Sequence, residues 1–99
     1  MNYKIEFKEQ ASQDIIEIVK WYSEQRDGLD DIFFTELELL TEQLQSNPYT
    51  FQVRRKNIRL GILKRFPYVI AYQIEYKKVI IFSITHQHSK KIYTRIKKK

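Results

Sequence analysis

The side chains that can do chemistry lie mainly in the second half of this 99-residue sequence. Five of them suit acid–base or phosphate chemistry: Arg59, Arg65, His86, His88 and Tyr93. Cleavage of RNA by its own 2′-hydroxyl needs a base for that proton, cations for the developing phosphorane charge, and an acid for the leaving 5′-oxygen. Histidine, arginine and tyrosine can supply all three roles, so these residues are the candidate catalytic groups if the chain is a nuclease. Residue type alone does not bring them together.

His86 also has a structural interpretation. Strand alternation places it on the same face as Phe82 and Ile84, which favours a structural histidine. His88 lies beyond the predicted strand. Two histidines at i and i+2 can bind a metal, but no cysteine or carboxylate accompanies them. We therefore expect neither a metal site nor another cofactor.

Charge divides the sequence into two halves. Residues 1–47 carry four Lys/Arg and eleven Asp/Glu, net −7, whereas residues 48–99 carry fourteen Lys/Arg and one acid, Glu75, net +13. A basic half in a small domain favours a polyanion such as nucleic acid, or an acidic protein partner. The alternative is a solvated basic face without a partner.

Hydrophobic periodicity predicts a strand and then a helix in the acidic half. Residues 3–7 alternate apolar and charged side chains, as a half-buried strand does. A helix of about four turns is expected from Glu9 to the break at Asp27-Gly28. Its apolar stripe consists of Ala11, Ile15, Ile18, Val19 and Tyr22.

A second helix is predicted to end at Asn47-Pro48, because proline cannot continue a helix. Its apolar stripe consists of Phe33, Leu37, Leu40 and Leu44. The two helices are expected to form an antiparallel hairpin. In that hairpin Trp21, Phe33 and Phe34 are interpreted as packing residues rather than a binding site.

The basic half is expected to form a loop, residues 48–57, followed by three strands. Residues 58–62 form the first strand, and the bend at residues 64–67 contains a proline, which interrupts a central ladder. One face of the second strand consists of Tyr68, Ile70, Tyr72, Ile74 and Tyr76. After a turn at Lys77-Lys78, residues 79–84 are apolar on both faces and therefore central. This β-α-α-β-β-β order predicts an α+β fold, with a helical hairpin on a small, mostly antiparallel sheet.

Residues 1–99 are expected to form one domain with a basic tail at about residues 89–99. Ile92 and Ile96 stand one helical turn apart, so a short helix and an unstructured arm both remain open for the tail. The sequence has no cysteine, and no apolar run resembles a signal peptide or a membrane span. We expect a soluble cytoplasmic protein with no membrane partner.

Several motifs occur in a specific order along nearly the whole chain. Residues 63–72 read Leu-Lys-Arg-Phe-Pro-Tyr-Val-Ile-Ala-Tyr, and a hydrophobic strand ending in Ile84-Thr85-His86 follows. The helices contribute Ala11, Asp14-Ile15, Trp21-Tyr22, Leu44 and Asn47-Pro48. Together these residues resemble the RelE/ParE superfamily of toxins from type II toxin–antitoxin systems, and the Arg-Phe-Pro-Tyr segment is similar to its ParE-like branch.

The resemblance implies one of two activities. RelE-like members cleave messenger RNA on ribosomes, whereas ParE-like members poison DNA gyrase, which is a protein-binding function. In RelE-like nucleases arginine follows the tyrosine that opens the third strand, but here Val69 follows Tyr68. The strand lysines of those nucleases align with Leu60 and Ile62. These departures favour gyrase inhibition, with a ribosome-dependent mRNA endoribonuclease as the alternative.

The resemblance also implies partners. A cognate antitoxin is expected to neutralise the toxin, and both a homodimer and a hetero-oligomer with the antitoxin are open. The residues expected to bind the target, gyrase or the ribosome with its mRNA, are Lys64, Arg65, Lys90, Lys91 and Arg95. The tail either adds to this contact or only solubilises the chain. A general RNA-binding module is a third hypothesis, but with two glycines the chain lacks the glycine-rich loops of common RNA platforms.

Overall fold

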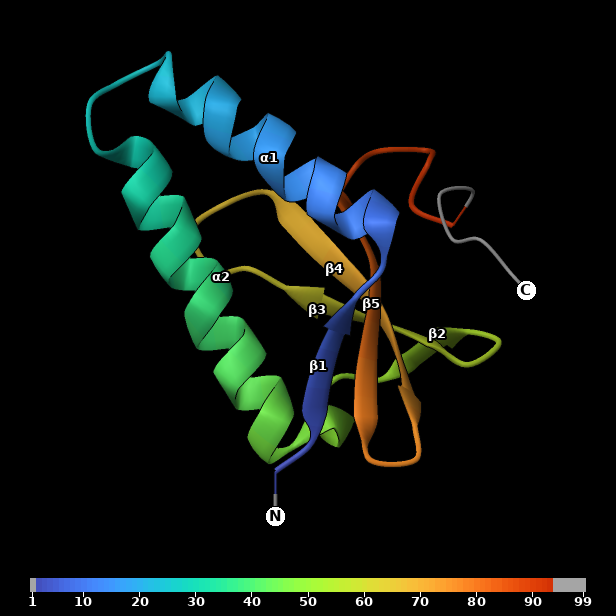
Figure 1. Cartoon of the computed structure of the whole chain (residues 1–99). Coiled ribbons are helices and arrows are strands. Elements are labelled where there is room, and N and C mark those ends of the chain that lie inside the picture. The colour runs from blue at the N-terminus through green and yellow to red at the C-terminus, as the bar shows by residue number, and fades with distance from the viewer. Residues whose placement is uncertain (1, 94–99) are drawn as a thin grey trace.

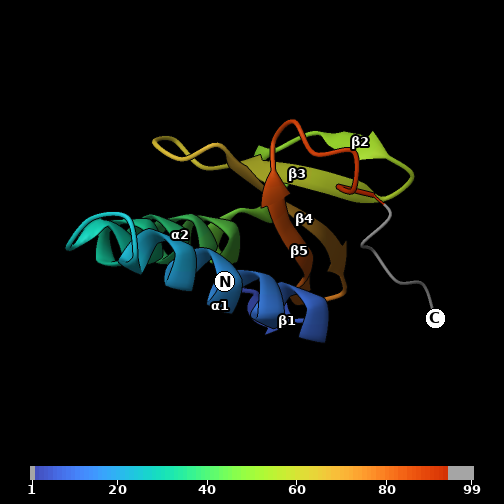
Figure 2. The ribbon, with the colours of Figure 1, turned by 90° about the horizontal axis from the view of Figure 1, so that it is seen from above.

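A computed structural model describes residues 2–93 of the chain. Its elements in chain order are β1 (Lys4–Phe7), α1 (Glu9–Ser23), α2 (Leu29–Ser46), the 3-10 helix η1 (Pro48–Thr50), β2 (Val53–Arg55), β3 (Ile58–Ile62), β4 (Tyr68–Glu75) and β5 (Lys78–His86). The strands form one sheet in the order β1-β5-β4-β3-β2, in which only β1 and β5 pair in parallel. Both helices cover the same face of this sheet (Figure 1 and Figure 2). The predicted α+β fold is confirmed.

The helices follow from their apolar stripes. The buried residues of the stripes are Ala11, Ile18 and Tyr22 in α1, and Phe33, Leu37, Leu40 and Leu44 in α2. Trp21 and Phe34, however, are 55% and 45% exposed, so their prediction as packing residues is wrong. At about 100° per residue, each is turned away from its buried neighbour in the helix. No helix within residues 2–93 is long and apolar enough to cross a membrane.

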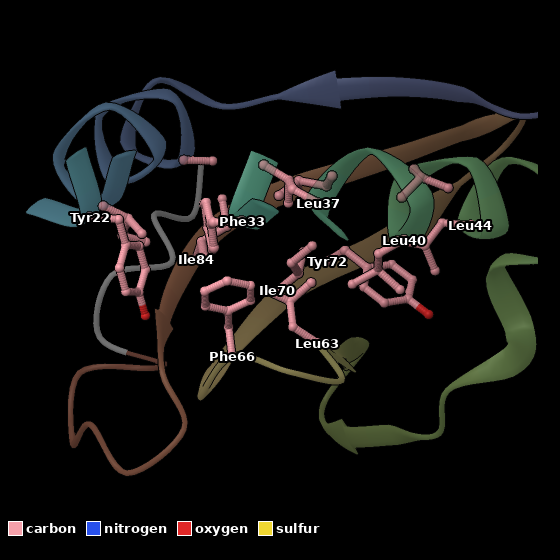
Figure 3. Packing of buried hydrophobic residues seen from close by; sticks show 14 residues of the cluster. Tyr22, Phe33, Leu37, Leu40, Leu44, Leu63, Phe66, Ile70, Tyr72 and Ile84 are labelled. Carbon is pink, nitrogen blue, oxygen red and sulfur yellow. The ribbon is translucent and has the colours of Figure 1, made fainter. Parts of the chain in front are cut away.

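The side of the sheet that faces the helices forms the main core. Leu63, Phe66, Ile70 and Tyr72 pack there beneath α2 (Figure 3). The buried hydroxyl of Tyr72 donates a hydrogen bond to the backbone carbonyl of Pro48 at 2.7 Å. Burial raises the pKa of Tyr72 to about 12, against an opposing effect of the nearby Arg59 charge.

The opposite face of the sheet carries a smaller cluster. Its buried members are Ile58, Ala71, Ile80 and Phe82, and the partly buried Leu60 and Tyr93 pack against them. β5 lies inside the sheet and buries side chains on both of its faces, as its apolar sequence predicted.

A bulge changes the faces of β5. Ala71 pairs with Ser83 and the next residue, Tyr72, pairs with Ile81, which leaves Phe82 as an extra residue. Phe82 therefore belongs to the smaller cluster, whereas Ile84 belongs to the main core. The prediction that Phe82 and Ile84 share a face is wrong, because strand alternation holds only where the pairing is regular.

Two further predictions need correction. The expected loop of residues 48–57 contains η1 and β2, and β2 pairs with β3 at the edge of the sheet. Tyr76 does not lie on the buried face of β4, since it is 96% exposed and has a φ of 60°. Glu75 pairs with Lys78, so Tyr76 and Lys77 form a tight turn of the kind that favours positive φ.

Candidate functional site

The loop between β3 and β4, residues 63–67, is anchored to α2 by one acid. The carboxylate of Glu36 accepts hydrogen bonds from Nε of Arg65 at 2.6 Å and from its backbone N–H at 3.2 Å. The Glu36 side chain is 10% exposed, whereas that of Arg65 is 68% exposed. Burial raises the pKa of Glu36, but hydrogen bonds and charge from Arg65 outweigh it and hold the pKa below its ordinary value. Arg65 is thus held at the surface, beside the exposed Lys64.

An aromatic group supports this loop from the core. The rings of Tyr22, Phe33, Phe66 and Tyr68 contact one another, with centroids between 5.1 and 6.3 Å apart. Burial raises the pKa of Tyr22 to about 12, with a further contribution from Tyr68. Edge-to-face packing of this kind fixes both the loop and the start of β4.

The two histidines lie at the end of β5. The ring of His86 is 5.8 Å from that of Tyr68, its partner in the sheet, and 5.7 Å from that of His88. The backbone N–H of His88 donates a hydrogen bond to Nδ1 of His86 at 3.1 Å, which places the proton of a neutral His86 on Nε2. Both side chains are exposed. His86 is therefore not the structural core residue expected, because it is the last residue of β5, at the end of the sheet.

Arg59 and Tyr93 are held in other parts of the sheet. The guanidinium of Arg59 lies 5.0 Å from the ring centroid of Tyr49, and it donates a hydrogen bond to the backbone carbonyl of Phe51. Tyr93 packs against the smaller cluster, and the guanidinium of Arg55 lies 4.9 Å from its ring centroid. Cation–π contacts of this kind hold both side chains in place.

The candidate nuclease residues therefore do not form one group. Arg59 pairs with Tyr72 and His86 pairs with Tyr68, four residues along β4, which corresponds to about 13 Å. Tyr93 lies on the other face of the sheet from the main core, to which Tyr72 belongs. Within residues 2–93, no three His, Cys, Asp or Glu side chains are grouped as metal ligands.

Some of the expected target-binding residues lie in two segments that meet at one end of the sheet. The backbone N–H of Gln87 donates a hydrogen bond to the carbonyl of Pro67 at 2.8 Å, which joins the segment after β5 to the loop that carries Arg65. Lys90 and Lys91 follow in this segment, and their side chains are exposed. Arg95 lies outside the described residues.

Sequence reasoning did not single out Glu36, the acid that anchors this loop. It lies beside Leu37 and four residues before Leu40, at the boundary of the apolar stripe of α2. An acid at such a boundary, in a chain whose facing loop is basic, was the available signal. The sequence does not show that this acid meets Arg65, because the contact joins residues 29 positions apart.

Residues 5–90 match the sequence profile of the family described as ParE toxin of type II toxin–antitoxin system, parDE. The chain belongs to the ParE toxin family. It is therefore a type II toxin of the RelE/ParE superfamily, as the sequence motifs indicated. A comparison with curated proteins finds no match to this toxin.

Solved structures share the fold of this ParE-family toxin. A chain of the chromosomal ParDE toxin–antitoxin system from P. aeruginosa has 17% identity and a TM-score of 0.68, covering 85% of this chain and 95% of that one. The RelBE2 complex from Mycobacterium tuberculosis has 18% identity and a TM-score of 0.61, covering 87% and 99%. A mutant E. coli toxin RelE in the free state has 16% identity and a TM-score of 0.62, covering 97% and 95%.

Proposed function

We propose that this toxin inhibits DNA gyrase by binding it, and that a cognate antitoxin neutralises it in the cytoplasm. The observation that carries the proposal is the separation of the candidate nuclease groups, since Arg59 and Tyr93 lie in structural contacts away from His86. RNA cleavage requires a base, cations and an acid around one phosphate. Inhibition by binding requires only a complementary surface.

The proposed contact with the target is the basic end of the sheet. Lys64 and Arg65 of the β3–β4 loop supply one part of it, and Lys90 and Lys91 supply another. The hydrogen bond between Gln87 and Pro67 joins the start of the segment after β5 to the end of the β3–β4 loop. Arg95 is assigned to the same contact from the resemblance alone. Clustered cations at one end of a small domain steer it toward acidic surfaces.

The antitoxin is proposed to fold over the helical hairpin and the sheet. Large apolar side chains remain exposed on α1 and α2, namely Ile16, Trp21, Ile32, Phe34 and Leu39. A disordered segment that folds over these residues and continues onto the basic sheet gains apolar burial on the helices and charge pairing on the sheet. Two structural neighbours come from the ParDE and RelBE2 toxin–antitoxin systems, which supports such a partner.

Co-expression with the small open reading frame that neighbours the gene tests the antitoxin proposal. We expect a soluble complex and relief of toxicity, and light scattering then distinguishes a toxin homodimer from a hetero-oligomer. Failure of any neighbouring small protein to co-purify or to relieve toxicity contradicts the proposal.

A second candidate function is ribosome-dependent cleavage of mRNA. The observation that favours it is the exposed pair His86 and His88 beside Tyr68, at the same end of the sheet as Arg65. These side chains can supply a base, a cation and an acid if a bound RNA brings them together. Arg59 and Tyr93 then have no direct role.

Induction of the toxin separates the two functions. We expect an early DNA-damage response with intact transcripts, and we expect Arg65→Ala to weaken it. Arg26→Ala is the matched control, because Arg26 is an exposed arginine in the loop after α1. Prompt cleavage of transcripts at ribosome-bound codons, abolished by His86→Ala in a folded protein, overturns the gyrase proposal in favour of the nuclease.

A further inference from the structure

Only part of the Arg65 guanidinium makes hydrogen bonds within the fold. Its Nε donates to Oε2 of Glu36 at 2.6 Å, and the backbone N–H of the same residue donates to Oε1 at 3.2 Å. Within residues 2–93, neither terminal nitrogen of Arg65 donates a hydrogen bond. The Arg65 side chain is 68% exposed to solvent.

This geometry leaves a fork of donors directed away from Glu36. An arginine side chain has five N–H donors, and Glu36 occupies the single one on Nε. The two terminal nitrogens retain four donors in the planar arrangement that binds a carboxylate or a phosphate through two parallel hydrogen bonds. A free arginine at the surface samples many rotamers, whereas this one is fixed at Nε before any ligand arrives.

Stability of the fold does not account for this arrangement by itself. An ion pair in which one partner is mostly exposed contributes little to folding. The carboxylate of Glu36 is also mostly buried, and Arg65 keeps it ionised in place at the expense of its own hydration. The acid must in addition lower the net positive charge around Arg65, which weakens long-range attraction to an acidic target.

We propose that Glu36 is a positioning residue that holds Arg65 so that its terminal nitrogens bind a carboxylate of the protein target. The inference rests on the proposed function, in which Arg65 contacts that target. It adds that geometry, and not charge alone, makes the contact. Lysine at position 65 keeps the charge but lacks the fork, so it cannot replace arginine.

The variant Glu36→Gln changes binding in opposite directions under the two explanations. If Arg65 acts only as a charge, Glu36→Gln removes a nearby negative charge and strengthens binding. If Glu36 positions the fork, Glu36→Gln weakens binding several-fold, and Arg65→Lys weakens it roughly tenfold or more. Glu38→Gln is the matched control, because Glu38 is an exposed acid on the same helix.

The measurements are growth inhibition on graded induction and affinity for purified gyrase, with the thermal midpoint of each variant recorded beside them. We expect Glu36→Gln to weaken both growth inhibition and affinity for gyrase. We expect the double variant Glu36→Arg/Arg65→Glu to regain thermal stability but neither growth inhibition nor affinity. Recovery of activity by this charge swap means that the pair is only structural and overturns the inference. Glu36→Gln binding as tightly as the unmodified chain, or more tightly, also overturns it.

Failure of the proposed function has a different signature. An unmodified chain that inhibits growth but does not bind gyrase refutes gyrase as the target, and the growth assay still tests Glu36. If Arg65→Lys then abolishes transcript cleavage, the ligand of the fork is a phosphate of RNA and not a protein carboxylate. An unmodified chain that does not inhibit growth refutes the proposed function and the inference together.

Discussion

Asp14 shows how a single buried acid completes the sheet. β1 pairs with β5 only as far as the pair Phe7 and Ile81, so Ile84 lies beyond the end of β1. The backbone N–H of Ile84 instead donates a hydrogen bond to Oδ2 of Asp14 at 3.0 Å. Asp14 is 3% exposed, and Gln10 donates a further hydrogen bond to its other oxygen at 3.0 Å. The side chain thus takes the place of a missing strand.

Replacing Asp14 with alanine is expected to lower the free energy of unfolding by about 1–3 kcal/mol, because it leaves the buried N–H of Ile84 without an acceptor. Asp14→Asn keeps an oxygen at the same place and should cost less. Gln13→Ala, an exposed change on the same helix, is the control. Urea denaturation measures all three, and equal small effects contradict the role of Asp14.

Glu36 is expected to make stability depend on pH. Its pKa is lowered in the folded chain from an ordinary value of 4.5, so the unfolded chain binds more protons just below that pH. The stabilisation is therefore present above about pH 4.5 and is lost as the pH falls through the lower folded pKa. Urea denaturation of Glu36→Gln should give a flatter profile over this acidic range than the unmodified chain does. An unchanged profile, matching that of Glu38→Gln, contradicts the prediction.

At the scale of elements, the sheet is covered unequally. The face toward α1 and α2 carries the main core. The other face carries a small cluster, against which Tyr93 of the segment after β5 packs. Figure 2 shows the helices on one side and the segment after β5 on the other. Each face buries its own apolar side chains, so both contribute to stability.

Truncation of one side chain on each face tests this arrangement. Leu40→Ala in the main core and Phe82→Ala in the smaller cluster should each cost about 2–5 kcal/mol of unfolding free energy. Ile62→Ala on β3 should have little effect, since Ile62 is 45% exposed. Chemical denaturation measures the three variants. A Phe82 variant as stable as the Ile62 variant means that the smaller cluster is not a true core.

At the scale of the molecule, the acidic half forms the helix layer and one edge strand, and the basic half forms the rest of the sheet. Residues 1–47 form β1 and both helices, and residues 48–99 supply the other four strands of the sheet. Within residues 2–93, most acids of the first half therefore lie on the helices, and the bases of the second half lie on the strands and loops of the sheet. We therefore expect the basic end of the sheet, rather than the helix layer, to attract an acidic partner.

The two layers are expected to unfold together, as one domain. The main core lies between the two layers, so neither layer has a complete core alone. Scanning calorimetry should show one transition with an enthalpy of about 60–80 kcal/mol, equal to the van't Hoff value. Two separate transitions contradict a single domain.

The sequence by itself determined the helices, the central position of β5 and the family. These features depend on local periodicity, on proline and glycine at helix ends, and on short motifs such as Arg65-Phe66-Pro67-Tyr68, all of which are visible in neighbouring residues. The apolar stripe of α2, for example, is buried as predicted.

Only the tertiary structure decided which functional side chains meet. The bulge at Phe82 moved one residue of β5 to the other face, and it depends on the pairing with β4 rather than on the sequence of β5. The contact between Glu36 and Arg65 joins residues far apart in the chain, as does the one between Asp14 and Ile84. Arg59 and His86 were equally good candidates by type, but strand register offset them by about 13 Å along the strand direction, on the two strands that flank β4. Residue types specify the available chemistry, whereas long-range pairing specifies which groups can act together.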